Sequence, residues 1–222
     1  VAGSGRYFPV ETSGPATSAL LDTEYVAVDG ERNVFVTVRH RVLRIDAESG
    51  DLSLVAGTGE DGFGGDGGPA TEALLSRPAG IVVDESGNVY VSDSGNRRVR
   101  RIDAATGIIE TVAGGVSRAA SPEDVPFTLS DPAGLAFDGR RKLYIVDKVS
   151  RVMQLDVRNG RLKAVASVPV GFGAATHIAV GPSGQLAISG YDQIWRVDPA
   201  SGAVKVIAGI EDYPGSSGDG GP

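Results

Sequence analysis

Residues 80–114 read GIVVDESGNVYVSDSGNRRVRRIDAATGIIETVAG. This stretch holds four short runs rich in Val and Ile, which are separated by turns of Asp, Gly, Asn and Ser. Short runs of this kind indicate strands, and the residues between them are typical of tight hairpins. The stretch therefore predicts four antiparallel strands in one small sheet.

The same four-run pattern occurs in three further places, at residues 25–57, 134–167 and 177–209. The Asp that follows the first run recurs as Asp29, Asp84 and Asp138, with Gly181 in the fourth copy. A four-stranded sheet that is apolar on both faces is not stable alone, so neighbouring sheets must cover it. Radial stacking of such sheets is the β-propeller. We therefore predict an all-β fold in which residues 1–222 form one β-propeller domain or fragment, with four visible blades of four antiparallel strands each.

Glycine-rich segments join these units. Residues 59–80 contain GDGGPAT, and GDGGP returns at residues 218–222. Each segment must lead from the last strand of one blade to the first strand of the next, which favours Gly and Pro. The GPATEALL part, from Gly68, favours a helical turn behind its Pro. Residues 1–14 align with residues 55–68, so we expect the chain to belong to a larger ring or tandem array.

Several short motifs resemble the NHL repeat, a family named for an Asn-His-Leu sequence. They are PAGIVVD (78–84), GNVYVSD (87–93), GNRRVRRID (95–103) and TVAG (111–114). Asn96 matches the Asn of the name and His40 matches the His, and the apolar slot holds Val42, Val99, Val152 and Ile194. The GDGGPAT connector is similar to the long-connector form of bacterial proteins. The resemblance implies a propeller, most often with six blades.

The resemblance and the topology together predict one functional face. Connections in an antiparallel sheet alternate between its two edges, so the connectors share a face with the loops that join second and third strands. Loops on a rigid scaffold are where binding residues concentrate. The candidate binding residues of this face are Asp93, Asn96, Arg97, Asp147, His177 and Asp192.

These residues suggest little chemistry. The carboxylates of the three Asp residues are oxygen ligands that Ca²⁺ or another divalent cation prefers, although Asp also caps turns through its own side chain. His177 begins an inner strand, but a single histidine at the channel mouth cannot form an imidazole metal cage. No nucleophile stands beside an orienting base in the sequence. We therefore predict no catalytic residues and no cofactor, with a divalent cation as the open alternative.

Composition narrows the class of partner. The formal net charge is −7 and 41% of residues are hydrophobic, so the chain can form a core and diffuse attraction to nucleic acid is not expected. The dense basic run RRVRR (97–101) lies within a strand pattern. No apolar run is long enough to span a membrane, so membrane insertion is not expected. Cysteine is absent, which leaves the compartment unconstrained.

The leading functional hypothesis is a non-catalytic binding or scaffold module within a larger protein, which we expect to be bacterial and secreted or exposed at the cell surface. Its partner is a protein or a small-molecule ligand on the connector face, and further blades come from the same or another chain. One alternative is a metal-dependent lyase or lactonase-type propeller enzyme whose remaining ligands lie outside this chain. A second alternative is an extracytoplasmic sensor domain of a kinase or receptor.

Overall fold

The computed structural model describes residues 12–19, 21–115, 128–148, 151–169, 175–190 and 193–209. Within these residues the regular elements are β-strands and short 3₁₀ turns. The chain forms two compact units, Val1–Gly115 and Val116–Pro222. In the described part of the chain, no helix is long and apolar enough to cross a membrane.

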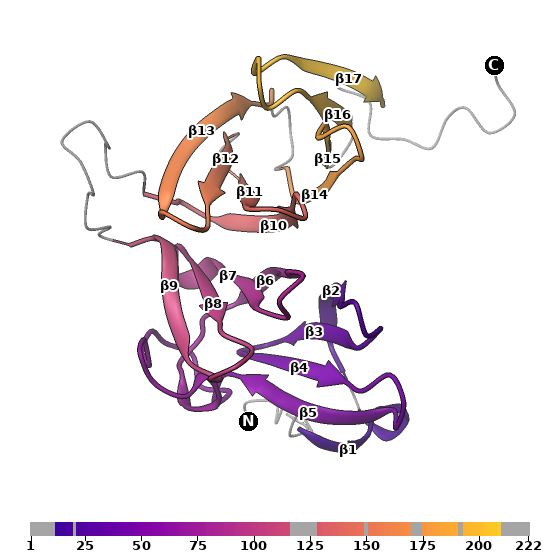
Figure 1. Cartoon of the computed structure of the whole chain (residues 1–222), viewed down its shortest axis with the longest axis vertical. Helices are drawn as coiled ribbons and strands as arrows, with labels where there is room; N and C mark the ends of the chain where they lie inside the picture. The colour runs from indigo at the N-terminus through magenta and orange to yellow at the C-terminus, as the bar shows by residue number, and fades with distance from the viewer. Residues whose placement is uncertain are drawn as a thin grey trace, which may run out of the picture. The chain divides into compact units, whose positions relative to one another are not determined.

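The first unit contains two antiparallel sheets, drawn from indigo to magenta in Figure 1. The strand order is β1-β5-β4-β3-β2 in one sheet and β6-β7-β8-β9 in the other. The strands are β1 (Ser13–Pro15), β2 (Thr23–Val28), β3 (Val34–Val38), β4 (Arg41–Ile45), β5 (Asp51–Ala56), β6 (Pro78–Val83), β7 (Val89–Asp93), β8 (Arg98–Ile102) and β9 (Ile109–Gly114).

The second unit also contains two antiparallel sheets, each with four strands in chain order. Its strands are β10 (Pro132–Phe137), β11 (Lys142–Asp147), β12 (Arg151–Asp156), β13 (Arg161–Ser167), β14 (His177–Val180), β15 (Leu186–Ser189), β16 (Ile194–Val197) and β17 (Val204–Ala208). The prediction of an all-β chain with four antiparallel blades of the β-propeller type is confirmed.

The connectors add an extended segment beside the outer strand of a blade, which the sequence pattern did not predict. In the first blade, Gly14 pairs with Leu52 and Pro15 with Asp51, so β1 is a fifth strand beside β5. Residues 67–70 occupy the same position on the next blade, where the Ala70 amide donates to the Gly107 carbonyl at 2.8 Å. A 3₁₀ turn follows each segment, η1 (Ala16–Ser18) and η2 (Ala70–Glu72). The connector therefore runs along the outer strand of the blade that it precedes before it reaches the inner strand.

Alternation along the strands builds the core between blades, because side chains two apart share one face of a sheet. In the first unit, Phe35 and Val42 of one blade pack in one cluster with Val91 and Ile102 of the next. In the second unit, Trp195 lies in the cluster that joins β14–β17 to β10–β13. Equivalent positions of the four third strands are fully buried, and they hold Leu43, Arg100, Met153 and Trp195. Three of these side chains are apolar or aromatic, and the second blade alone places a charge there.

Candidate binding surface

Asp93 ends β7 and is fully buried. One carboxylate oxygen accepts the backbone N–H of Ser76 at 2.7 Å, and the other accepts the Asn96 side-chain amide at 2.8 Å. Burial raises the pKa of Asp93, and the hydrogen bonds from Asn96 and Ser76 and the charge of Arg100 oppose that rise. Asp93 thus fastens the chain entering β6 to the end of β7.

Arg100 extends this network into the connector. Its guanidinium is fully buried and lies 3.3 Å from the Asp93 carboxylate and 2.7 Å from that of Asp66. It also donates to the Gly64 carbonyl at 3.1 Å and to the Leu74 carbonyl at 3.4 Å. A buried guanidinium needs several such acceptors to offset the loss of hydration. Arg100 therefore holds the glycine-rich connector in place.

Asp147 has the corresponding role in the second unit. Its buried carboxylate accepts the backbone N–H groups of Ser130 and Asp131. It also accepts a 2.6 Å hydrogen bond from the Arg151 guanidinium. The repeated Asp at the end of the second strand thus closes the inner hairpin in two blades. The equivalent position is Val38 in the first blade.

The other predicted residues are placed differently. Asn96 is half-buried, and its side-chain amide also donates to the Gly62 carbonyl at 2.7 Å. Arg97 is exposed and has left-handed backbone geometry, with φ 57°. His177 is exposed, and its Nδ1 lies 2.9 Å from the Thr176 hydroxyl. Asp192 lies outside the described residues. In the first unit, the fold therefore brings Asp93, Asn96 and Arg97 together at one end of β7.

The connector adds an aromatic side chain to this surface. Phe63 keeps 45% of its area exposed. The guanidinium carbon of Arg98 lies 4.0 Å from its ring centroid and that of Arg100 lies 5.2 Å away. Stacking of this kind fixes the ring through cation–π attraction. Phe63 was not predicted as a binding residue, although it is the one aromatic residue within the glycine-rich stretch 59–80.

Arg77 was also missed. It is exposed, has φ 45° and precedes β6. Its backbone N–H lies 3.5 Å from the His40 Nδ1, and the same ring nitrogen lies 3.6 Å from the Asp61 carboxylate. We use the name connector surface for Arg39, Phe63, Arg77, Arg97 and Arg98.

The described residues contain no group of three or more His, Cys, Asp or Glu side chains that could hold a metal ion. The oxygens of Asp93 and Asp147 already accept hydrogen bonds from protein donors. These two carboxylates therefore stabilise the local backbone by accepting its hydrogen bonds.

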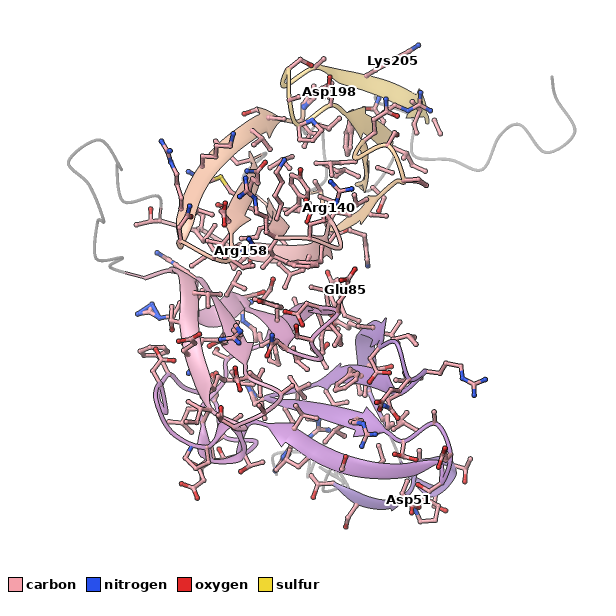
Figure 2. All side chains as sticks on the ribbon, in the orientation of Figure 1. Asp51, Glu85, Arg140, Arg158, Asp198 and Lys205 are labelled. Carbon is pink, nitrogen blue, oxygen red and sulfur yellow. The ribbon has the colours of Figure 1, made fainter. Side chains whose placement is uncertain are left out.

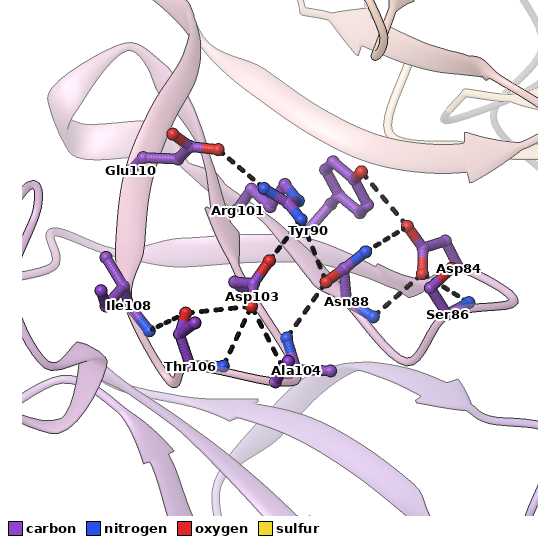
Figure 3. A network of polar contacts seen from close by, with 11 residues as sticks. Asp84, Ser86, Asn88, Tyr90, Arg101, Asp103, Ala104, Thr106, Ile108 and Glu110 are labelled. Atoms are coloured by element: carbon purple, nitrogen blue, oxygen red, sulfur yellow. Dashed lines mark hydrogen bonds and ion pairs between the residues drawn. The ribbon is translucent and has the colours of Figure 1, made fainter.

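A groove of about 740 Å³ lies at the opposite ends of the strands of the first unit. Its polar lining includes Asp29, Glu31, Asp84, Glu85 and Asp103. Figure 3 shows that part of this lining is a network that completes the turns. Asp84 accepts the backbone N–H groups of Ser86 and Asn88, each at 2.9 Å.

The same network includes Tyr90 and Arg101 (Figure 3). Burial, together with the nearby charge of Asp84, raises the pKa of Tyr90 to about 12. Hydrogen bonds from the hydroxyl and backbone of Thr106 lower the pKa of Asp103. Arg101 pairs with Asp103 at 2.6 Å and with Glu110 at 2.8 Å. The carboxylates of Asp84 and Asp103 are therefore part of the hairpin structure.

The chain has the features of an NHL-repeat β-propeller. It has four antiparallel blades, and Asp93 and Asp147 close the inner hairpins of two of them. Asn96 and His40 lie in loops that follow second strands. The family model of the Teneurin NHL domain matches residues 16–128, half of the chain. The chain belongs to this family.

Curated relatives agree with this assignment. Teneurin-3 of Danio rerio is 40% identical over 130 residues, which cover 49% of this chain and 5% of the relative. Teneurin-4 of Homo sapiens is 30% identical over 230 residues, which cover 87% of this chain and 8% of the relative. The chain thus spans a tenth or less of the length of the relatives it matches. Both teneurins are eukaryotic, so the bacterial connector type stays a prediction.

Solved structures support the fold. An auxiliary nutrient binding protein from Bacteroides thetaiotaomicron has a TM-score of 0.66 at 14% identity, covering 92% of this chain and 46% of its own. A streptogramin B lyase has a TM-score of 0.57 at 14% identity, covering 85% of this chain and 54% of its own. At this level of identity, both likenesses concern the fold alone.

Proposed function

We propose that this chain is a binding module that takes a protein partner on the connector surface of its first unit. The observation that carries the proposal is the exposed Phe63 ring, stacked on the Arg98 guanidinium at 4.0 Å. Aromatic and Arg side chains are the residues most enriched at the energetic centres of protein interfaces. A ring that is already fixed loses little side-chain entropy on binding.

The scaffold around Phe63 supports the same role. The Asn96 amide holds the Gly62 carbonyl, and Arg100 holds the Gly64 carbonyl, so both neighbours of Phe63 are anchored. A surface that is ordered before binding avoids the cost of ordering a loop. The groove at the other end of the strands lacks this argument, because Asp84 and Asp103 are engaged in turns.

Further blades remain part of the proposal. Val26 of β2 is 63% exposed, whereas Ile81, at the equivalent position of β6, is 5% exposed because the first blade covers it. The exposed inner strand β2 of the first blade therefore suits another NHL blade of the same construction. The partner that would cover Val26 is a four-stranded sheet, from the same or another chain.

The lyase and sensor alternatives are not adopted. The streptogramin B lyase shares 14% identity with this chain, and no set of described residues favours its reaction. A divalent cation likewise has no support beyond the carboxylates already described.

The experiment selects peptides from a random display library against the full chain and maps where they bind. A photo-crosslinking phenylalanine analogue replaces Phe63 in one variant and Glu85 in the control. Glu85 lies in the β6–β7 turn, at the other end of β7 (Figure 2 labels it). Crosslinking at position 63 and not at 85 supports the proposal. Selected peptides that crosslink at 85, or at neither position, overturn it.

A further inference from the structure

Three arginines near the connector have left-handed backbone geometry. The φ angles are 52° for Arg39, 45° for Arg77 and 57° for Arg97. This geometry costs a non-glycine residue about 1–2 kcal/mol, and Gly or Asn adopts it more readily. An arginine there contributes no backbone advantage, so its long cationic side chain is the feature that distinguishes it. Strained positions of this kind cluster at functional sites.

Contacts between the loops bring Arg77, Arg97 and Phe63 to one place. The Gly95 N–H donates to the Ser76 carbonyl at 2.9 Å, which sets the loop carrying Arg97 beside Arg77. A side chain on Gly95 would overlap Ser76, so the two segments pack closely. The Asn96–Gly62 hydrogen bond brings Phe63 to the same loop.

Two of the cations on this surface have no ionic partner among the described residues. The side chains of Arg77 and Arg97 are exposed, and neither forms a salt bridge within the part of the chain that the structure describes. Other arginines of the first unit are paired, as Arg44 is with Asp46 and Arg101 with Asp103.

The neighbouring carboxylates differ in their partners. Asp66 lies 2.7 Å from the buried Arg100, whereas Asp61 is 65% exposed and lies 3.6 Å from the His40 Nδ1, the same ring nitrogen that faces the backbone N–H of Arg77. Asp66 also accepts a 2.7 Å hydrogen bond from the Thr111 hydroxyl. Among the described residues, the charges of Arg77 and Arg97 therefore stay unpaired beside an exposed aromatic ring.

We propose that Arg77 and Arg97, together with Phe63, receive an acidic peptide segment of a partner protein, in which carboxylate side chains alternate with apolar ones. The inference rests on the proposed function and names the chemistry of the partner. The guanidinium groups form paired hydrogen bonds with carboxylates, and the Phe63 ring packs against the apolar residue. The side chains of Arg77 and Arg97 can therefore pair with one or two carboxylates of the peptide.

A nucleic acid fits the surface less well. Strong binding to its backbone requires many phosphate contacts, and the chain carries a formal net charge of −7. A short acidic segment needs only local complementarity, which a screened surface supplies over about 8–10 Å.

The test measures fluorescence anisotropy of a labelled nine-residue peptide with three Glu-Glu-Leu repeats, titrated with the full chain. A peptide with Lys in place of Glu is the first control. We expect the acidic peptide to bind, with affinity that falls as salt rises, and the basic peptide not to bind. R77E/R97E lowers the affinity for the acidic peptide at least tenfold, and R77Q/R97Q lowers it by less.

The matched control is R140E/R158E, which makes the same change in net charge at two exposed turns of the second unit (Figure 2). We expect this variant to bind within twofold of the parent. Glu in place of Arg keeps the backbone cost similar, and circular dichroism verifies folding. Equal losses in the two double variants, or no preference for the acidic peptide, overturn the inference.

Failure of this inference is separable from failure of the proposed function. If library peptides crosslink at position 63 but are not acidic and bind R77E/R97E normally, the proposed binding surface is supported and the acidic partner is overturned. If no selected peptide crosslinks at position 63, both proposals are overturned.

Discussion

The carboxylate of Asp93 and the guanidinium of Arg100 lie 3.3 Å apart, and both side chains are fully buried. The first blade has Val38 and Leu43 at the same two positions. The same blade architecture is thus built once around an ion pair and once around two apolar residues. The ion pair is found where the connector supplies polar acceptors, at Gly64, Asp66 and Leu74.

This relationship gives the first prediction. R100L leaves the Asp93 carboxylate buried without its cation, and D93V leaves the guanidinium without one of its anions. Each single change is expected to cost about 3–5 kcal/mol. The double variant D93V/R100L gives the second blade the same apolar pair that the first blade has. It is expected to be more stable than either single variant. Urea unfolding followed by circular dichroism measures this, and additive losses would contradict it.

A second prediction concerns the glycine that ends β9. Gly114 has φ 80°, and a Cβ there would lie 2.2 Å from the Arg97 carbonyl oxygen. Gly107 has φ 68° and open space around it. G107A is therefore expected to lower the free energy of unfolding by about 1–2 kcal/mol, the cost of left-handed backbone geometry for a non-glycine residue. G114A is expected to lower it by more, because a backbone atom blocks the added side chain. Thermal unfolding of the two variants compares them. Equal losses would show that the contact relaxes without cost.

The exposed inner strand β2 gives a third prediction. I81A is expected to cost about 2–5 kcal/mol, because it leaves a cavity between two blades. V26A removes methyl groups that are already in water and is expected to cost less than about 1 kcal/mol. In a longer natural protein containing this chain, hydrogen exchange at β2 is expected to slow if another blade covers it. A large loss for V26A in this chain alone would show that this strand is already covered.

The fourth prediction is a pH dependence. Hydrogen bonds from Thr106 lower the pKa of Asp103 below 3.8, the usual value. A lowered pKa in the folded state contributes stability at pH values above the unfolded pKa, and this contribution disappears as the pH falls through the folded pKa. The chain is therefore expected to lose stability below about pH 4, and D103N to lose less of it between pH 7 and pH 3.

The control for this prediction is D51N. Asp51 is an exposed carboxylate of the first unit (Figure 2), and its side chain accepts no hydrogen bond among the described residues. Its replacement makes the same change in net charge as D103N without removing an acceptor of a turn. Urea unfolding at the two pH values checks both variants, and an equal reduction in D51N would contradict the role of Asp103.

Sequence reasoning predicted the blades correctly because their signals are local. Alternating apolar residues and short Asp, Gly and Asn turns specify a hairpin within a few residues, and the pattern occurs four times. It did not predict that residues 13–15 and 67–70 lie along outer strands, because the Gly-Pro segments lack the alternation of a strand.

The binding face shows the same division between local and long-range information. The strand topology predicts that the connector lies beside the loop after β7, and the Asn96–Gly62 hydrogen bond joins the two. The sequence could not distinguish Asp93, which is buried, from Arg97, which is exposed. Asp93 ends β7 and Arg97 lies in the loop that follows it, and their exposure depends on which segment covers them.

The amino-acid sequence by itself determined the strands, their turns and their repetition, since these depend on neighbouring residues. The tertiary structure alone decided which polar side chains face water. Phe63 and Arg98 stand 4.0 Å apart although a whole inner hairpin separates them along the chain. Contacts between segments so distant depend on how the connector folds back over the blade, and no local pattern encodes that path.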